Sequence, residues 1–78
     1  MFDKKLLQAA MDAHGDRHSD LAAALGVSPQ NFSVIWNGRQ EFRRSHIIVI
    51  AVRYRLDPFS IWNIFLKDDA EKLKGQEA

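Results

Sequence analysis

The chain of 78 residues contains no cysteine, which excludes disulfide bridges, thiolate zinc sites, iron–sulfur ligation and cysteine nucleophiles. It also lacks a long apolar run: the longest, Ile47–Val52, has six residues, far fewer than the roughly 20 that span a bilayer. Asp3 and Asp12 interrupt the region in which a signal peptide would build its apolar core. We therefore expect one small cytoplasmic domain that does not contact a membrane.

Recognisable catalytic patterns are missing as well. The four glycines are scattered and form no phosphate-binding loop, and no Ser, His and Asp occur at a workable catalytic spacing. His14 and His18 are four residues apart, but Gly15 interrupts the helix that would present both to one metal ion. We expect no enzyme activity, no metal, no cofactor and no small-molecule substrate.

Positive charge is concentrated in the middle of the chain. Residues 28–56 contain five arginines and a single acidic residue, Glu41, whereas both flanking segments carry a slight acidic excess. The planar guanidinium of arginine is well suited to forked contacts with phosphate groups. This distribution favours a local site for a polyanion.

Helix start and stop signals punctuate the chain. Capping residues suited to helix N-termini are Asp3, Ser28, Ser45 and Asp57; Pro29 and Pro58 stand at first helical positions, and Gly15 and Gly26 are suited to helix ends. These signals predict an all-α fold of five helices: from Asp3 to Gly15, Ser19 to Leu25, Pro29 to about Trp36, Ser45 through the run Ile47–Val52, and Pro58 to about Leu66. In the third helix, Phe32 and Ile35 form the inward stripe, with Trp36 partly included.

The run Ile47–Val52 is rich in β-branched residues and would by itself suggest a buried strand. No other segment alternates with period two, so a lone strand would have no partner, and we expect a central helix contacted on most sides. Residues 1–67 form the expected domain. Residues 68–78 are a charged tail that we expect to fray.

The string from Ser19 to Ser28 is the most specific pattern in the chain. Ala22 is small where two helices must approach closely, Gly26 supplies the turn, and Val27 fills the angle between the helices. A short helix, a glycine turn and a second helix of this spacing are typical of a helix-turn-helix.

This part of the chain resembles the phage-repressor and Cro family of DNA-binding domains, typified by the lambda and 434 repressors. The resemblance covers residues 3–66 and rests on Leu21-Ala22, Leu25-Gly26-Val27-Ser28, Trp36-Asn37-Gly38, and Ala51 followed by Tyr54, Leu56, Asp57 and Pro58. It implies a five-helix lambda-repressor-like bundle whose second and third helices form the helix-turn-helix. It also implies sequence-specific binding to double-stranded DNA.

Base contacts are expected from the N-terminal half of the third helix, which the resemblance places in the major groove. Gln30 and Asn31 carry amides that can form paired hydrogen bonds with adenine. Val34, one turn later, either touches a thymine methyl group or is an ordinary exposed valine. Gln40, in the following loop, is the fourth candidate.

Phosphate contacts are expected along the same surface, from His18, Ser28, Ser33, Asn37, Arg39, Arg43 and Arg44. The alternative is that the three arginines lie in a solvated loop and their charges bind no partner. Arg53 and Arg55 differ, because they lie near the C-terminal end of a helix, where the helix dipole favours cations.

The chain departs from the family at several positions. His18 stands where the family often has a glutamine that contacts a phosphate, and Arg17 stands where a Ser or Thr cap is usual, so capping falls to Asp16 or Ser19. Arg55 occupies a position that is glycine in many relatives. Either it adopts a strained backbone or the turn there differs.

The fifth helix carries more apolar surface than one face of a small domain can bury. We expect a two-fold homodimer through this helix, with an interface formed by Phe59, Trp62, Phe65 and Leu66.

The functional hypothesis is a transcriptional regulator of the phage or prophage repressor kind, bound as a dimer to a near-palindromic operator in double-stranded DNA. The alternative is a protein-interaction module of the same fold, an antitoxin-like or anti-repressor component, which uses the fifth helix to bind its partner.

Overall fold

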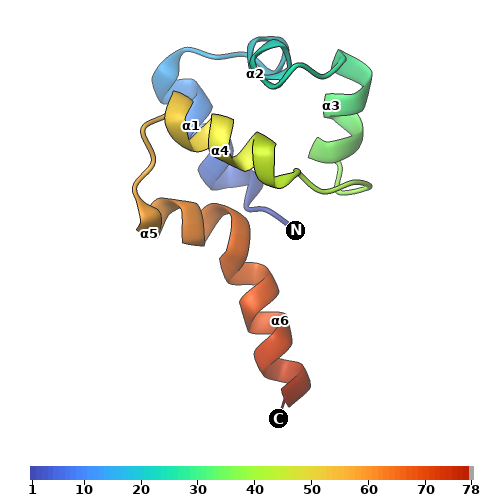
Figure 1. The fold of residues 1–78 in the computed structure, drawn as a ribbon, viewed down its shortest axis with the longest axis vertical. Coiled ribbons are helices and arrows are strands. Elements are labelled where there is room, and N and C mark those ends of the chain that lie inside the picture. Colours follow the sequence, from blue (N-terminus) through green and yellow to red (C-terminus); the bar gives the residue numbers. More distant parts are fainter. Residues whose placement is uncertain (78) are drawn as a thin grey trace.

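The computed structural model describes residues 1–77 and the side chains of residues 1–74. Its elements are α1 (Lys4–His14), α2 (His18–Leu25), α3 (Pro29–Trp36), α4 (Arg44–Arg53), α5 (Pro58–Ile61), the π-helical turn η1 (Trp62–Leu66) and α6 (Lys67–Glu77) (Figure 1). No strand occurs in this part of the chain, so the prediction of an all-α fold is confirmed.

Three of the four predicted helix caps are confirmed. The side chains of Asp3, Ser28 and Asp57 each accept a hydrogen bond from the backbone N–H three residues later, at 3.0, 3.0 and 2.7 Å. Gly26 ends α2 in the left-handed conformation, with φ of 71°, which lets the chain reverse within two residues and enter α3.

The predictions for the starts of α2 and α4 are wrong. Ser45 caps nothing: α4 begins one residue earlier, and the backbone N–H of Arg43 donates to Nδ1 of His46 at 3.2 Å. Neither Asp16 nor Ser19 is the N-cap of α2, because Arg17 occupies that position and its N–H donates to Asp20 at 2.9 Å. In both helices a side chain in the first turn satisfies the backbone in place of a cap.

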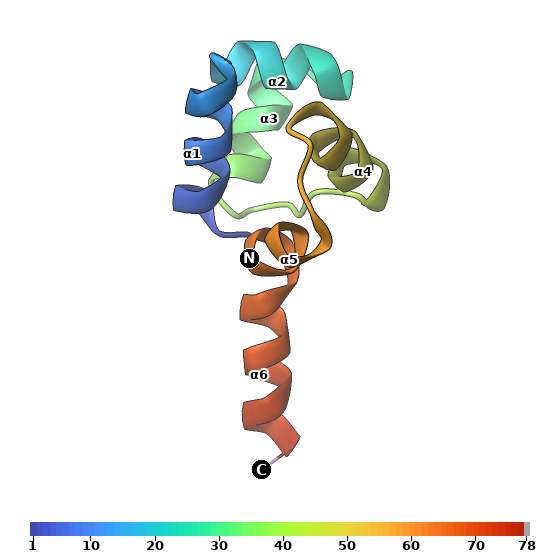
Figure 2. The same ribbon diagram turned by 90° about the vertical axis from the view of Figure 1, so that its left-hand side faces the viewer.

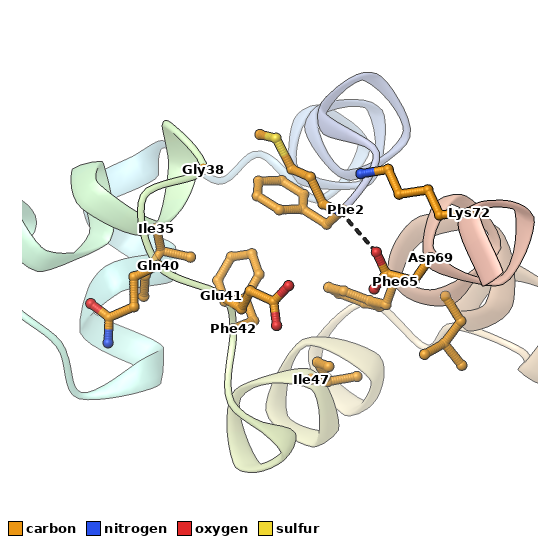
Figure 3. Close-up of a pocket in the computed structure, with 12 residues that line it drawn as sticks. Phe2, Ile35, Gly38, Gln40, Glu41, Phe42, Ile47, Phe65, Asp69 and Lys72 are labelled. Carbon is orange, nitrogen blue, oxygen red and sulfur yellow. Dashed lines mark hydrogen bonds and ion pairs between the residues drawn. The ribbon is translucent and has the colours of Figure 1, made fainter. Parts of the chain in front are cut away.

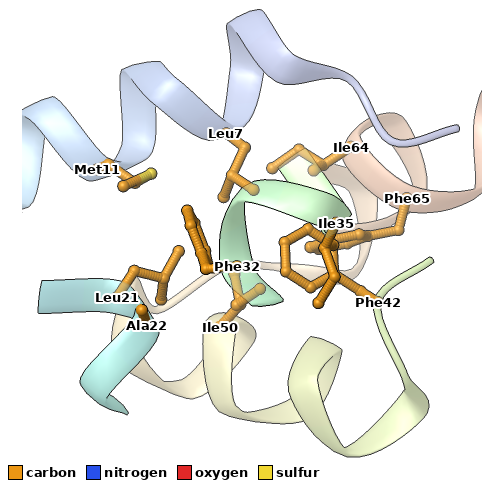
Figure 4. Close-up of a cluster of buried hydrophobic side chains, with 10 residues drawn as sticks. All are labelled: Leu7, Met11, Leu21, Ala22, Phe32, Ile35, Phe42, Ile50, Ile64 and Phe65. Carbon is orange, nitrogen blue, oxygen red and sulfur yellow. The ribbon is translucent and has the colours of Figure 1, made fainter. Parts of the chain in front are cut away.

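The hydrophobic core lies between α1, α2, α3, α4 and η1 (Figure 4). Its buried residues are Leu7, Met11, Leu21, Ala22, Phe32, Ile35, Phe42, Ile50, Ile64 and Phe65. Phe32 and Ile35 form the buried face of α3, and Trp36 packs against the core while remaining half-buried, as predicted. The core therefore holds α3 by one face and leaves its opposite face in solvent.

The prediction that α4 is contacted on most sides is wrong. Of its apolar run only Ile50 is buried, whereas Ile48 is exposed and Val52 is 74% exposed. Within residues 1–77 no other element covers the outer face of α4, so the helix lies at the edge of the bundle (Figure 2).

The predicted fifth helix is divided and longer than expected. It starts at Pro58 as predicted, but η1 interrupts it with a hydrogen bond from the N–H of Lys67 to the carbonyl of Trp62. Beyond η1, the segment expected to fray is the helix α6, which projects away from the other helices (Figures 1 and 2). π-turns of this kind bend helices, which explains the change of direction between α5 and α6. None of the helices described is both long and apolar enough to cross a membrane.

Candidate nucleic-acid interface

The outer face of α3 is the first part of the candidate interface. α3 follows α2 after the turn at Gly26, and Figure 1 shows α2 end-on and α3 from the side, so the two helices cross steeply. Ala22 is buried at this junction and Val27 packs against the core, as the sequence predicted. The junction therefore fixes the direction of α3.

Polar side chains occupy the face of α3 that the core does not use. Gln30 and Ser33 are exposed, Asn31 is half-buried, and Val34 is 38% exposed beside them. Asn37 is exposed at the end of the helix, and its amide lies 3.4 Å from the hydroxyl of Ser33. The structure thus brings the predicted base-contact residues of α3 together on one accessible surface.

Ser28 is the N-cap of α3. Its hydroxyl accepts the N–H of Asn31 at 3.0 Å, while its side chain remains exposed at the tip of α3. A serine in this position can still donate its hydroxyl hydrogen outward, because only an acceptor lone pair is engaged.

The loop from Asn37 to Arg43 carries the positive part of the interface. Gly38 has φ of 83°, and the buried ring of Phe42 anchors the far end of the loop in the core. Arg39, Arg43 and Arg44 are exposed. Among the side chains described, none of the three forms an ion pair, so their charges are directed to solvent.

The two residues between Arg39 and Phe42 point in different directions (Figure 3). The amide of Gln40 points away from α6, whereas the carboxylate of Glu41 turns toward Asp69 and Phe65. Both residues line a hollow of about 380 Å³ between the loop, the N-terminal segment and α6. The single acidic residue of the basic segment is thereby turned to the side of α6.

The side chain of His18 is exposed, but it contacts other residues of the same chain. Its ring lies over Trp36, with centroids 4.4 Å apart, and its Nε2 lies 2.8 Å from Oε1 of Gln8. The predicted phosphate contact is therefore limited to the second ring nitrogen, because Nε2 already has a partner. Trp36 and Gln8 are the residues that orient the ring.

Arg53 is not part of the basic surface and makes a contact within the chain. Its guanidinium donates to both carboxylate oxygens of Asp16, at 2.6 and 2.8 Å, and Tyr54 donates its hydroxyl to the same carboxylate at 2.7 Å. The hydrogen bonds from Arg53, with a smaller contribution from Tyr54, lower the pKa of Asp16 from 3.8 to about 2 against the opposing effect of burial. The sequence offered no short-range signal for this contact.

His46 is the residue whose role the sequence missed beside the interface. Its imidazole accepts the N–H of Arg43, which fixes the backbone from which that arginine extends. Burial, and then the charge of Arg43, lower the pKa of His46, which favours the neutral ring that can accept this bond. The signal available in the sequence was that His46 lies three residues after Arg43, the spacing at which a first-turn side chain can accept the N–H of the N-cap residue.

The expected dimer interface needs one correction. Phe65 is only 6% exposed and packs edge-on against Phe42, with ring centroids 6.0 Å apart, so it belongs to the core. Phe59, Trp62 and Leu66 remain exposed on the same segment. The π-turn changes which residues of the segment face inward.

Comparison of the chain with models of protein families, with curated proteins and with solved structures found no match. Within the described residues, no three His, Asp or Glu side chains are grouped closely enough to hold a metal ion.

Proposed function

We propose that the chain is a sequence-specific transcriptional regulator that binds double-stranded DNA, of the phage or prophage repressor kind. In this proposal α2 and α3 form a helix-turn-helix within a lambda-repressor-like bundle, and α3 enters the major groove. The observation that carries it is the continuity of the polar outer face of α3 with a loop of exposed, unpaired arginines.

Gln30, Asn31, Val34 and Gln40 read base edges. The amides of Gln30 and Asn31 stand in the first turn of α3, the part of a recognition helix that reaches deepest into the groove. An amide matches the N6 donor and N7 acceptor of adenine, and an aliphatic group matches the methyl of thymine. Val34 lies one turn further along the same exposed face.

Arg39, Arg43 and Arg44 bind phosphates on both sides of this contact, together with His18, Ser28, Ser33 and Asn37. Such contacts determine affinity and register, and they make binding sensitive to salt through the release of counterions. The direction of Glu41 supports this role, because its carboxylate points toward α6 and away from Gln40 (Figure 3).

The regulator acts as a dimer. Two copies of α3 related by a two-fold axis enter successive major grooves about 34 Å apart and read a near-palindrome whose half-sites are about one helical turn apart. The exposed apolar residues Phe59, Trp62 and Leu66 support self-association.

In-vitro selection on a random duplex library at near-physiological salt tests this function. We expect enrichment of a two-fold-related site by the full chain. Arg43→Ala should enrich the same site more weakly, and Lys5→Ala, which removes an exposed charge from α1, is the matched control. Selection without any enriched sequence would contradict the proposal.

A protein-interaction module is the second candidate, favoured by the 74% exposure of Phe59. In that case an antitoxin-like or anti-repressor role would use α5 and η1 to bind a different protein. Salt-dependent binding of duplex DNA by the purified chain separates the two, because the second candidate does not require it.

A further inference from the structure

The first turn of α6 is held to the N-terminus, because the amine of Met1 donates to Asp68 and Asp69 at 3.2 and 3.1 Å, but the helix extends beyond these contacts. It projects from the bundle, and its one large apolar residue, Leu73, is 59% exposed (Figure 2). α6 continues η1 without a break. Its distal turn, which carries Leu73, is therefore available for packing against another molecule.

An apolar stripe runs along α6. Leu66, Ala70 and Leu73 follow one another at intervals of four and three residues, the spacing of a helix-packing seam, and Trp62 precedes them across the π-helical turn. Trp62, Ala70 and Leu73 line one open hollow of about 440 Å³, and the other lining residues are Lys67, Glu71 and Lys74. Leu66 is 46% exposed and also borders the hollow beside Phe2 and Phe42. We call the surface of the outer hollow, with Leu66 added at its edge, the arm face.

The molecule exposes more surface than a compact chain of its size. Its accessible surface is 5503 Å², against about 4,900 Å² for a compact monomer of this mass. The excess is roughly 600 Å² per copy, as expected for a chain with a projecting helix. Stable protein interfaces bury about 1,200 Å² or more in total.

Charges beside the stripe complement a second copy of the same helix. Lys67 and Glu71 border the hollow, both are exposed, and among the side chains described neither forms an ion pair. When two such helices run antiparallel and cross near residue 69, Lys67 of each copy faces Glu71 of the other. In this register Leu66 of one copy falls between Ala70 and Leu73 of the other, so the two stripes interdigitate.

We propose that the arm face binds the arm face of a second copy in an antiparallel, two-fold pair, with Leu66 and Leu73 at its centre and two reciprocal Lys67–Glu71 ion pairs. This inference deepens the proposed function by naming how its dimer is formed. The pairing itself requires no DNA.

Sedimentation equilibrium of the full chain, without DNA, tests the pairing. We expect a dimer, and Leu73→Glu should raise its dissociation constant at least about tenfold, because a charge is placed in the apolar seam. Val52→Glu, which changes another exposed apolar residue, on α4, is the matched control and should leave the constant unchanged. A monomer at all concentrations, or equal effects of the two variants, would overturn the proposal.

A charge-exchange experiment tests the register without relying on Leu73. Lys67→Glu and Glu71→Lys should each weaken the dimer, because each places like charges opposite one another. An equimolar mixture of the two variants should associate more tightly than either alone, since every facing pair is then of opposite sign. If the two substitutions only changed the stability of the helix within each chain, mixing the variants would not tighten association. No gain on mixing would therefore overturn the antiparallel pairing.

The two proposals fail separately. A dimer that responds to these variants but does not select a DNA site would leave the arm pairing intact and refute the DNA-binding function. A selected DNA site bound by a chain whose dimerisation ignores the arm variants would refute the pairing alone.

Discussion

Asp16 and Arg53 meet in a two-point ion pair although 37 positions separate them in the sequence. The pair joins the connection between α1 and α2 to the C-terminal end of α4, and the side chain of Asp16 is only 7% exposed. Both carboxylate oxygens of Asp16 accept hydrogen bonds, two from Arg53 and one from Tyr54. Loss of the ion pair should therefore be felt in the stability of the fold.

Asp16→Asn should lower the free energy of unfolding by about 2 kcal/mol at neutral pH, because the depression of the Asp16 pKa from 3.8 to about 2 is lost with the carboxylate. Urea unfolding of the two chains measures the difference. Asp12→Asn, at an exposed position of α1, is the control and should have little effect.

The same pair predicts an acid transition. Because folding lowers the pKa of Asp16, its contribution to stability is present above pH 4 and is lost as the pH falls from about 4 to about 2. The unfolding free energy of the natural chain should drop over this interval more than that of Asp16→Asn. Parallel pH profiles would show that the ion pair contributes no stability.

Gln30→Ala should reduce discrimination at one base pair of the selected site by about 1–3 kcal/mol, because the amide contacts a base edge. Binding to unrelated duplex should change little. Competition titrations with single-base variants of the site measure this. A uniform loss at every sequence would mean that α3 does not read bases.

Arg43→Ala should weaken binding to all duplexes alike and reduce the slope of log affinity against log salt by about 1, as expected for one lost phosphate contact. Affinities measured between about 50 and 200 mM salt give the slope. An unchanged slope would place Arg43 outside the interface.

Trp62→Ala and Phe65→Ala should have different effects although the residues are three positions apart. Phe65 is buried, so its truncation should cost about 3 kcal/mol of folding stability by leaving a cavity. Trp62 is 44% exposed, so its truncation should mainly weaken self-association. Thermal unfolding and light scattering on both variants separate the effects, and a reversed result would exchange the two assignments.

Much of the local structure was predictable because its causes are local. The caps at Asp3, Ser28 and Asp57, and the glycine that ends α2, each depend on a few neighbouring residues. The same reason explains why Gln30 and Val34 were correctly placed on the outer face of α3: helical periodicity and the burial of Phe32 and Ile35 leave that face free.

Arg55 illustrates an alternative that the sequence left open. The structure resolves it: Arg55 adopts φ of +52°, a region that side chains with a Cβ atom enter only at a cost. Of the two alternatives, the strained backbone at Arg55 is the one that the structure adopts.

The sequence by itself determined that the chain is helical, where α3 begins, and that arginines follow it, because propensity, capping and charge are properties of short segments. Only the tertiary structure decided that Asp16 binds Arg53, that Phe65 is buried while Trp62 is exposed, and that α4 keeps an open face. These outcomes depend on which elements meet in space, and in so small a domain the number of covering elements determines which apolar faces remain in solvent. The π-turn adds one residue to a helical turn, and this single change of phase redirects every side chain beyond it.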